Sequence, residues 1–318
     1  MGAEEGAGVK IAVTSIMKDE PHEFVERWVK SAVDADVMML ADTGSTNGCA
    51  DVARDLGVVV HDIRIRPWRF DLARNVAMAL VPEDVDVIVK LDVDEVLGYG
   101  WRNALEDAPT AQRYSYLYVW NYDEDGKPDV QFMADHTHAR FGWQWRHPVH
   151  EALEAAPGTV AAPEATGMVI EHRSDSSKSR SQYLPLLEQA VIEDPSDDRM
   201  AHYFARELFF RGNWTRSRIE FQRHLSLPTA KWAPERAQSF RYLAKMDTFP
   251  ERWLLRAVAE DPARREPWVD LADLHLAEGN EKMAAAYAQR ALTIVGRPGD
   301  YMTEAHAWDD ARLREIAG

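Results

Sequence analysis

The chain has 318 residues, of which 46% are hydrophobic and 10% aromatic, enough for two domains with separate cores. Its 37 basic and 53 acidic residues give a net charge of −16, which disfavours nonspecific binding to nucleic acids or anionic membranes but leaves room for a local basic groove. The N-terminal segment lacks a signal-peptide pattern, there is no apolar run of 18 residues, and the single cysteine excludes an internal disulfide, so we expect a cytoplasmic protein without membrane contact.

Short apolar runs alternate with amphipathic stretches from residue 10 to about residue 175. The pattern predicts strands over residues 11–16, 37–42, 58–63 and 85–92, and helices around residues 24–29, 49–57 and 70–80. This order is typical of an α/β, Rossmann-like fold with a mostly parallel sheet and right-handed crossovers. Later strand-like runs at residues 114–120, 130–135 and 168–173 are separated by turns, so we expect the second half of the sheet to be mixed.

The polar segment "SDSSKSRS" at residues 174–181 ends the strand pattern and predicts a domain boundary. We therefore expect one domain over residues 1–175 and a second over residues 182–318. The second repeats itself: "AVIEDP" begins at Ala190 and "AVAEDP" at Ala257, which is 67 residues later. The same offset pairs Ala205 with Ala272 and the "GN" at residues 212–213 with that at residues 279–280.

Half of this offset is close to the period of about 34 residues in tetratricopeptide repeats. The run "PWVDLADLHLAEGNEKMAAAYAQRAL" resembles that repeat in Trp268, Leu271, Ala272 and Gly279. Small alanines allow paired helices to approach closely, and the Gly-Asn turn ends one helix and starts the next. We expect an all-α, tetratricopeptide-like domain that either binds a partner or only supports the first domain or a dimer.

Acidic residues gather where three predicted strands end. Glu20 follows the first strand, Asp42 ends the second, and Asp92, Asp94 and Glu95 follow the run "VIVKL". In open parallel sheets, ligands bind at the carboxyl ends of the strands. Three neighbouring acids repel one another unless a cation or water reaches them, so this run indicates either a strand that leaves the core or a metal-diphosphate site.

Four segments in this order resemble inverting glycosyltransferases of family 2, which have the GT-A fold. The segments are "SIMKDEPHEFVERWV", "ADTGSTNG", "WRFDLARNVAMA", and "LDVDEVL" followed by "GW". The resemblance covers roughly half of the chain, and related enzymes commonly carry a tetratricopeptide-like tail. It implies a GT-A domain that binds a nucleoside-diphosphate sugar and a divalent metal ion.

The resemblance also implies a metal site. Asp92 would lie near the ribose and Asp94 would ligate Mn²⁺ or Mg²⁺, with both side chains on one face of the strand because side chains alternate. Such an ion neutralises the diphosphate as it leaves the sugar. His172, at the end of the run "MVIEHR", is the expected histidine ligand and His150 is the second candidate. The alternative for His172 is a histidine that is only hydrogen-bonded.

Other positions are implied to contact the nucleotide. The residues expected to line its pocket or bind its base and ribose are Thr14, Ile16, Glu20 and Asp42. Arg74, in "LARN", matches a family position near the nucleotide, where an arginine suits uracil or phosphate; the alternative is a surface charge on a helix. Apart from the resemblance, Lys178 or Arg180 in the polar segment is expected to reach the diphosphate when substrate binds.

An inverting transfer also needs a base that takes the proton from the acceptor hydroxyl. Glu151, in the "VHE" pattern, is the first candidate and Asp135 is the second. The alternative for Glu151 is an acid placed at the start of a helix, where it interacts with the helix dipole.

The expected function is metal-dependent, inverting transfer of a sugar from a nucleoside-diphosphate sugar, with a UDP-sugar favoured, to a hydroxyl of a protein, peptide or other macromolecule. A modified DNA base is a second acceptor class, which the negative net charge disfavours. A hypothesis from a different functional class is that the chain is a non-catalytic nucleotide-binding scaffold that works through its repeats.

Overall fold

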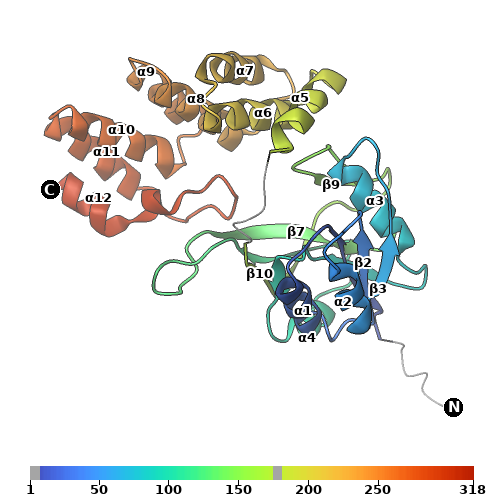
Figure 1. Cartoon of the computed structure of the whole chain (residues 1–318). Helices are drawn as coiled ribbons and strands as arrows, with labels where there is room; N and C mark the ends of the chain where they lie inside the picture. Colours follow the sequence, from blue (N-terminus) through green and yellow to red (C-terminus); the bar gives the residue numbers. More distant parts are fainter. Residues whose placement is uncertain (1–7, 175–180) are drawn as a thin grey trace. The chain divides into compact units, whose positions relative to one another are not determined.

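The computed structural model describes residues 8–174 and 181–318, and the chain divides into two compact units, residues 1–178 and 179–318 (Figure 1). The first unit is α/β and the second contains helices without a strand among its described residues. This confirms the predicted fold class, an α/β domain followed by an all-α, tetratricopeptide-like region. None of the described helices has the length and apolar character that a membrane crossing requires.

The first unit contains a sheet of eight strands in the order β3-β2-β1-β4-β7-β6-β10-β5, and a separate pair, β8 and β9. The strands are β1 (Ile11–Met17), β2 (Val37–Asp42), β3 (Val59–Asp62), β4 (Val87–Lys90), β5 (Glu95–Leu97), β6 (Arg113–Val119), β7 (Gln131–Ala139), β8 (Trp143–Arg146), β9 (Ala152–Ala155) and β10 (Glu164–His172). The helices are α1 (His22–Ser31), α2 (Cys49–Asp55), α3 (Phe70–Leu80) and α4 (Trp101–Glu106).

The sheet is parallel in its first half and mixed in its second, as predicted. Strands β3, β2, β1 and β4 run parallel, so their carboxyl ends meet at one edge of the sheet. Strand β7 is antiparallel to both β4 and β6, while β10 is parallel to β6 and antiparallel to β5. The β10–β5 pairing aligns His172 with Glu95, which brings the end of β10 beside the acidic run.

Alternating side chains of β1 supply both cores of the α/β unit. Ile11 and Val13 are fully buried in a cluster that includes Trp28 of α1. Ala12 lies in a cluster on the other face, and Ile16 packs with Ala77 of α3 there. The sheet is therefore covered by α1, α2 and α4 on one face and by α3 on the other, and the polar ends of its parallel strands remain at the edge.

The second unit consists of helices that pack in consecutive pairs. They are α5 (Tyr183–Glu193), α6 (Asp198–Phe210), α7 (Trp214–Ser226), α8 (Ala233–Lys245), α9 (Glu251–Glu260), α10 (Arg265–Ala277), α11 (Glu281–Leu292), the short 3₁₀ helix η1 (Ala305–Trp308) and α12 (Asp310–Ala317). Helices α6 and α10 begin 67 residues apart, and so do α7 and α11. The sequence repeat therefore corresponds to a repeated helical hairpin.

The turns of the two hairpins have the same structure. Gly212 and Gly279 adopt φ values of 75° and 74°, in the left-handed region that favours glycine. Asn213 and Asn280 then cap the following helices by accepting hydrogen bonds from the backbone N–H of Arg216 and Met283. The Gly-Asn pair thus ends one helix and begins the next at both places.

We expect Asn213→Ala and Asn280→Ala to lower the free energy of unfolding by similar amounts, about 1 kcal/mol each, because each removes the acceptor of one helix-capping hydrogen bond. Urea unfolding followed by far-UV circular dichroism would measure both losses. Aspartate at either position should restore the cap and most of the stability. A loss at only one site would contradict the equivalence of the two turns.

Candidate active site

The acidic run forms a turn between two strands. Strand β4 ends at Lys90 and β5 begins at Glu95. The Asp92 N–H donates to Glu95 Oε2 at 2.7 Å, and the Glu95 N–H donates to the Asp92 carbonyl at 2.8 Å. The expectation that strand alternation puts Asp92 and Asp94 on one face is wrong, because the strand ends before either residue. The turn directs the two carboxylates to different partners.

Asp92 is held by two cations. Arg74 Nη1 donates to Asp92 Oδ1 at 2.9 Å, and Lys90 Nζ donates to Asp92 Oδ2 at 2.7 Å. Burial raises the pKa of Asp92, but Arg74 and Lys90 outweigh it and hold the pKa well below its ordinary value. The same guanidinium donates from Nε to Glu151 Oε1 at 2.6 Å. Arg74 therefore joins the predicted ribose contact to the first candidate base.

Lys90 and Glu95 stabilise the turn. Lys90 was not predicted as a site residue, and Glu95 was named only as part of the acidic run, without a role of its own. Glu95 is buried and accepts a hydrogen bond of 2.7 Å from the Tyr118 hydroxyl. Lys90 Nζ lies 3.4 Å from Glu95 Oε2 while it contacts Asp92. Burial raises the pKa of Glu95. The signal in the sequence was a lysine inside the apolar run "VIVKL", where a buried cation needs acidic partners.

Asp94 is directed instead toward His172. The distance from Asp94 Oδ2 to His172 Nε2 is 3.5 Å. The other ring nitrogen, Nδ1, lies 3.2 Å from the carbonyl oxygen of Trp120, and because a carbonyl only accepts, Nδ1 is the donor. In the neutral ring, Nε2 then presents its lone pair toward Asp94. Burial lowers the pKa of His172, but Asp94 and the Trp120 carbonyl outweigh it and raise the pKa overall.

Trp120 is a further residue that sequence analysis missed. Its indole ring stacks on the His172 ring with 4.4 Å between ring centroids, and the tryptophan remains 41% exposed. It directly follows β6, at the end of the aromatic run "YSYLYVW". The backbone carbonyl and the ring of Trp120 together fix the orientation of His172.

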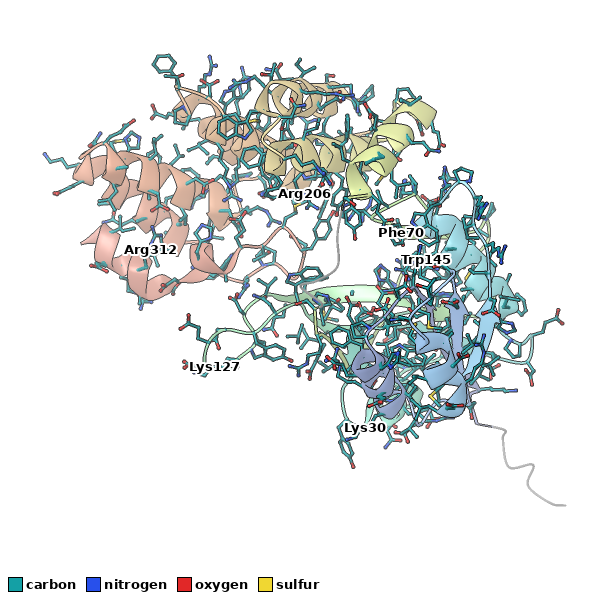
Figure 2. All side chains as sticks on the ribbon, in the orientation of Figure 1. Lys30, Phe70, Lys127, Trp145, Arg206 and Arg312 are labelled. Atoms are coloured by element: carbon teal, nitrogen blue, oxygen red, sulfur yellow. The ribbon has the colours of Figure 1, made fainter. Side chains whose placement is uncertain are left out.

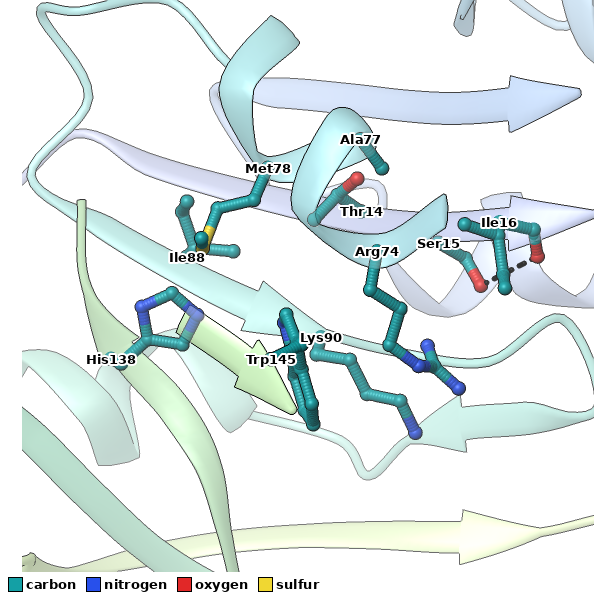
Figure 3. A pocket seen from close by; sticks show the side chains of 10 residues that line it. All are labelled: Thr14, Ser15, Ile16, Arg74, Ala77, Met78, Ile88, Lys90, His138 and Trp145. Atoms are coloured by element: carbon teal, nitrogen blue, oxygen red, sulfur yellow. Dashed lines mark hydrogen bonds between the residues drawn. The ribbon is translucent and has the colours of Figure 1, made fainter. Parts of the chain in front are cut away.

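A small pocket lies under α3, against β1 and β4 (Figure 3). Three of the predicted nucleotide contacts, Thr14, Ile16 and Arg74, are among the residues that line it. Figure 3 shows Arg74 and Lys90 extending in the same direction beside the Trp145 ring. The guanidinium carbon of Arg74 is 5.4 Å from the centre of that ring. The pocket is therefore lined partly by apolar side chains and partly by Arg74 and Lys90, two cations that are paired with acids.

The loops after β1 and β2 are joined by hydrogen bonds. Asp42 is buried and accepts from the backbone N–H of Ser45 at 3.1 Å. Asn47 Nδ2 donates to the carbonyl oxygen of Glu20, itself a buried residue, at 2.8 Å. Glu20 and Asp42 thus lie in or beside two hydrogen-bonded loops at the carboxyl edge of the sheet, although neither lines the pocket under α3.

The remaining predicted site residues differ in their surroundings. Asp135, on β7, forms an ion pair of 2.9 Å with Arg113 of β6. His150 has a φ of 55°, in the left-handed region, and directly precedes Glu151. No third histidine, cysteine or acid in the described parts of the chain comes within 4.8 Å of the ligand atoms of both Asp94 and His172, so His150 does not complete a preformed cluster with them. Lys178 and Arg180 lie outside the described residues.

No protein-family model matches the chain, and no curated protein sequence matches it. Among solved structures, it is similar to glucosyl-3-phosphoglycerate synthase from Mycobacterium tuberculosis in complex with Mn²⁺, UDP and glucosyl-3-phosphoglycerate, with 17% identity and a TM-score of 0.29 over 42% of this chain and 57% of that one. It is also similar to MamA, with 15% identity and a TM-score of 0.31; the match covers 42% of this chain and 80% of MamA. A third similar structure is that of a mycobacterial protein, with 16% identity and a TM-score of 0.37; the match covers 56% of this chain and 71% of that one. Such distant likenesses do not show a family.

Proposed function

We propose that the protein is a metal-dependent glycosyltransferase that moves a sugar from a nucleoside-diphosphate sugar, preferentially a UDP-sugar, to a hydroxyl of a protein or peptide with inversion at the anomeric carbon. The observation that carries the proposal is the pairing of Asp94 with His172 beside the cationic group of Arg74 and Lys90. Groups that could bind an anion and a metal ion would thereby be adjacent at the carboxyl edge of the parallel strands.

The Asp94–His172 pair suits a divalent ion. Two ligand atoms that share an octahedral ion at about 2.1 Å stand about 3 Å apart, and the measured separation of 3.5 Å is close to this value. The hydrogen bond from His172 Nδ1 to a backbone carbonyl is the usual support of a metal-binding histidine. Asp94 and His172 would hold Mn²⁺ or Mg²⁺, with diphosphate oxygens and water as further ligands. The ion would neutralise the departing nucleoside diphosphate.

Glu151 is the residue we propose as the base. Its side chain is 11% exposed, and one carboxylate oxygen accepts a hydrogen bond from Arg74 Nε at 2.6 Å. The acceptor hydroxyl would transfer its proton to the Glu151 carboxylate while the hydroxyl oxygen attacks the anomeric carbon. The sugar–phosphate bond breaks in the same step. Asp135 suits this role less well because its ion pair is with Arg113 of β6, whereas Glu151 shares Arg74 with Asp92.

The pocket residues Thr14, Ile16 and Arg74, with Glu20 and Asp42 in the adjacent loops, are the proposed nucleotide contacts. Thr14 Oγ1 is buried and makes no hydrogen bond within the described chain, so a polar ligand group would satisfy it. The acceptor class is proposed from the helical repeats, which in other proteins commonly present a surface to a polypeptide.

Thermal shift with UDP and Mn²⁺ tests the proposal. At 100 times the dissociation constant, a ligand stabilises the folded state by about 2.7 kcal/mol, so the melting temperature should rise by roughly 5 °C. UDP without a divalent ion, and Mn²⁺ without nucleotide, should each give a much smaller shift. Equal stabilisation by UDP in the presence of EDTA would contradict a metal-dependent site.

A donor panel separates an enzyme from a scaffold. Incubation with different UDP-sugars and Mn²⁺ in the absence of acceptor should release UDP slowly from one donor, because water substitutes for the acceptor hydroxyl. A scaffold would bind UDP in the thermal experiment without releasing it from any sugar. That outcome would replace the catalytic proposal with the binding one.

A further inference from the structure

The helical unit contains a second group of ionisable residues, far in sequence from the proposed active site. His202 of α6, His224 of α7 and Glu235 of α8 each offer one ligand atom, and these atoms lie within 4.8 Å of one another. Both histidines are fully buried and Glu235 is 3% exposed. Nothing in the proposed sugar transfer uses these residues.

One serine orients both imidazole rings. Ser239 Oγ lies 2.8 Å from His202 Nδ1 and 2.9 Å from His224 Nδ1. The other nitrogen of His224, Nε2, lies 3.2 Å from Glu235 Oε1, yet it makes no hydrogen bond with any described residue. A buried nitrogen that faces a carboxylate without a hydrogen bond is unusual, since buried polar atoms are normally satisfied.

The internal repeat shows that the packing does not require these histidines. With the offset of 67 residues, His202 corresponds to Val269 of α10, and His224 corresponds to Ala291 of α11. Val269 and Ala291 are fully buried, as the two histidines are. The same helical hairpin is thus built with apolar residues at these positions. Burial of imidazoles and a carboxylate costs stability unless a partner compensates for it.

We propose that His202, His224 and Glu235 bind one divalent ion of the Zn²⁺ type, which links α6, α7 and α8. Two imidazoles and one carboxylate are a suitable ligand set for Zn²⁺, with a fourth position for water. Ser239 acts as the outer partner that fixes the rings. Because all three ligand residues are buried, the ion has a structural role in the helical unit. This inference is independent of the proposed transferase activity.

Cobalt titration of the full chain tests the site, because Co²⁺ replaces Zn²⁺ and gives intense visible bands only in tetrahedral surroundings. After removal of metal with EDTA, one equivalent of Co²⁺ should give these bands, and Zn²⁺ should displace it. The double variant His202→Val and His224→Ala copies the residues of the second hairpin, so it should fold and lose the bands. Asp94→Asn should keep them, since it alters only the proposed catalytic metal site.

A second variant guards against misfolding. If circular dichroism shows that the double variant is unfolded, Glu235→Gln removes one ligand and should weaken Co²⁺ binding by at least about tenfold. Absence of the bands in the unsubstituted protein would overturn the proposal. So would unchanged bands in the folded double variant or in Glu235→Gln, or their loss in Asp94→Asn.

Discussion

Asp94→Ala is expected to abolish Mn²⁺-dependent binding of UDP, with affinity reduced by at least about 100-fold. The substitution removes the carboxylate whose oxygen lies 3.5 Å from His172 Nε2. Loss of an outer partner of a metal ligand already costs 10- to 100-fold in affinity by rough measure, so loss of a direct ligand should cost more. Isothermal titration calorimetry with UDP, in the presence of saturating Mn²⁺, would give the dissociation constants of the variant and of the unsubstituted protein.

A matched control for this variant is Asp125→Asn. Asp125 is an exposed acid in the loop between β6 and β7, the loop whose tip carries Lys127 in Figure 2. Asp125→Asn changes the net charge by the same amount without touching Asp94 or His172, so UDP affinity should remain that of the unsubstituted protein. Metal-dependent binding that survives in Asp94→Ala would place the ion elsewhere and remove the basis of the proposed site.

Arg74→Met is expected to reduce the free energy of unfolding by about 3 kcal/mol and to remove nucleotide binding. Asp92 and Glu151 both lose a partner, at 2.9 Å and 2.6 Å respectively, and their side chains are only 30% and 11% exposed. Removal of one member of a largely buried ionic group leaves uncompensated charge behind. Urea unfolding at pH 7 would measure the stability, and titration with UDP and Mn²⁺ would measure binding.

The pH dependence gives an independent check on Arg74→Met. Because Asp92 has a folded-state pKa below its ordinary value of 3.8, its ionic interactions stabilise the protein fully above that value and lose their effect as the pH falls below it. The free energies of unfolding of the unsubstituted protein and of Arg74→Met should therefore differ by a constant amount near neutral pH, and this difference should become smaller below about pH 4. A difference that widens in acid would contradict the role given to Asp92.

Arg54→Met is the matched control for Arg74→Met. Arg54 also bridges two carboxylates, those of Asp51 and Asp62, each at 2.9 Å. The side chains of these two acids are 79% and 75% exposed, so water replaces the lost ion pairs. The free energy of unfolding of Arg54→Met should not differ measurably from that of the unsubstituted protein. Equal losses in the two variants would show that burial does not determine the cost.

The sequence predicted the order of the elements because hydrophobic periodicity depends on local burial. Strands β1, β2 and β4 and the repeated hairpin all followed from such patterns. Partners brought together by the fold could not be predicted in the same way. Arg74 and Glu151 are 77 residues apart in the chain, yet they form an ion pair, and no local pattern links them.

The candidate site was predictable where polar residues follow strands and unpredictable where the backbone turns. Asp92, Asp94 and His172 were singled out because they end apolar runs. Their separate directions depend on where β4 ends, a detail that element patterns do not resolve. The hydrogen bond that supports His172 goes to the backbone carbonyl of Trp120, a group that every residue possesses and that therefore leaves no trace in the sequence. The stacked ring of Trp120 is visible in the sequence, but no local pattern links it to His172.

The strand order also has a consequence for solubility. The two outermost strands of the large sheet, β3 and β5, have four and three residues, so each offers few unpaired backbone groups to another chain. Asp62, at the end of β3, is held by Arg54 in an ion pair of 2.9 Å and adds charge at that border. The short edge strands thus disfavour edge-to-edge aggregation, so an eight-stranded sheet can stay open without pairing with the sheet of another molecule.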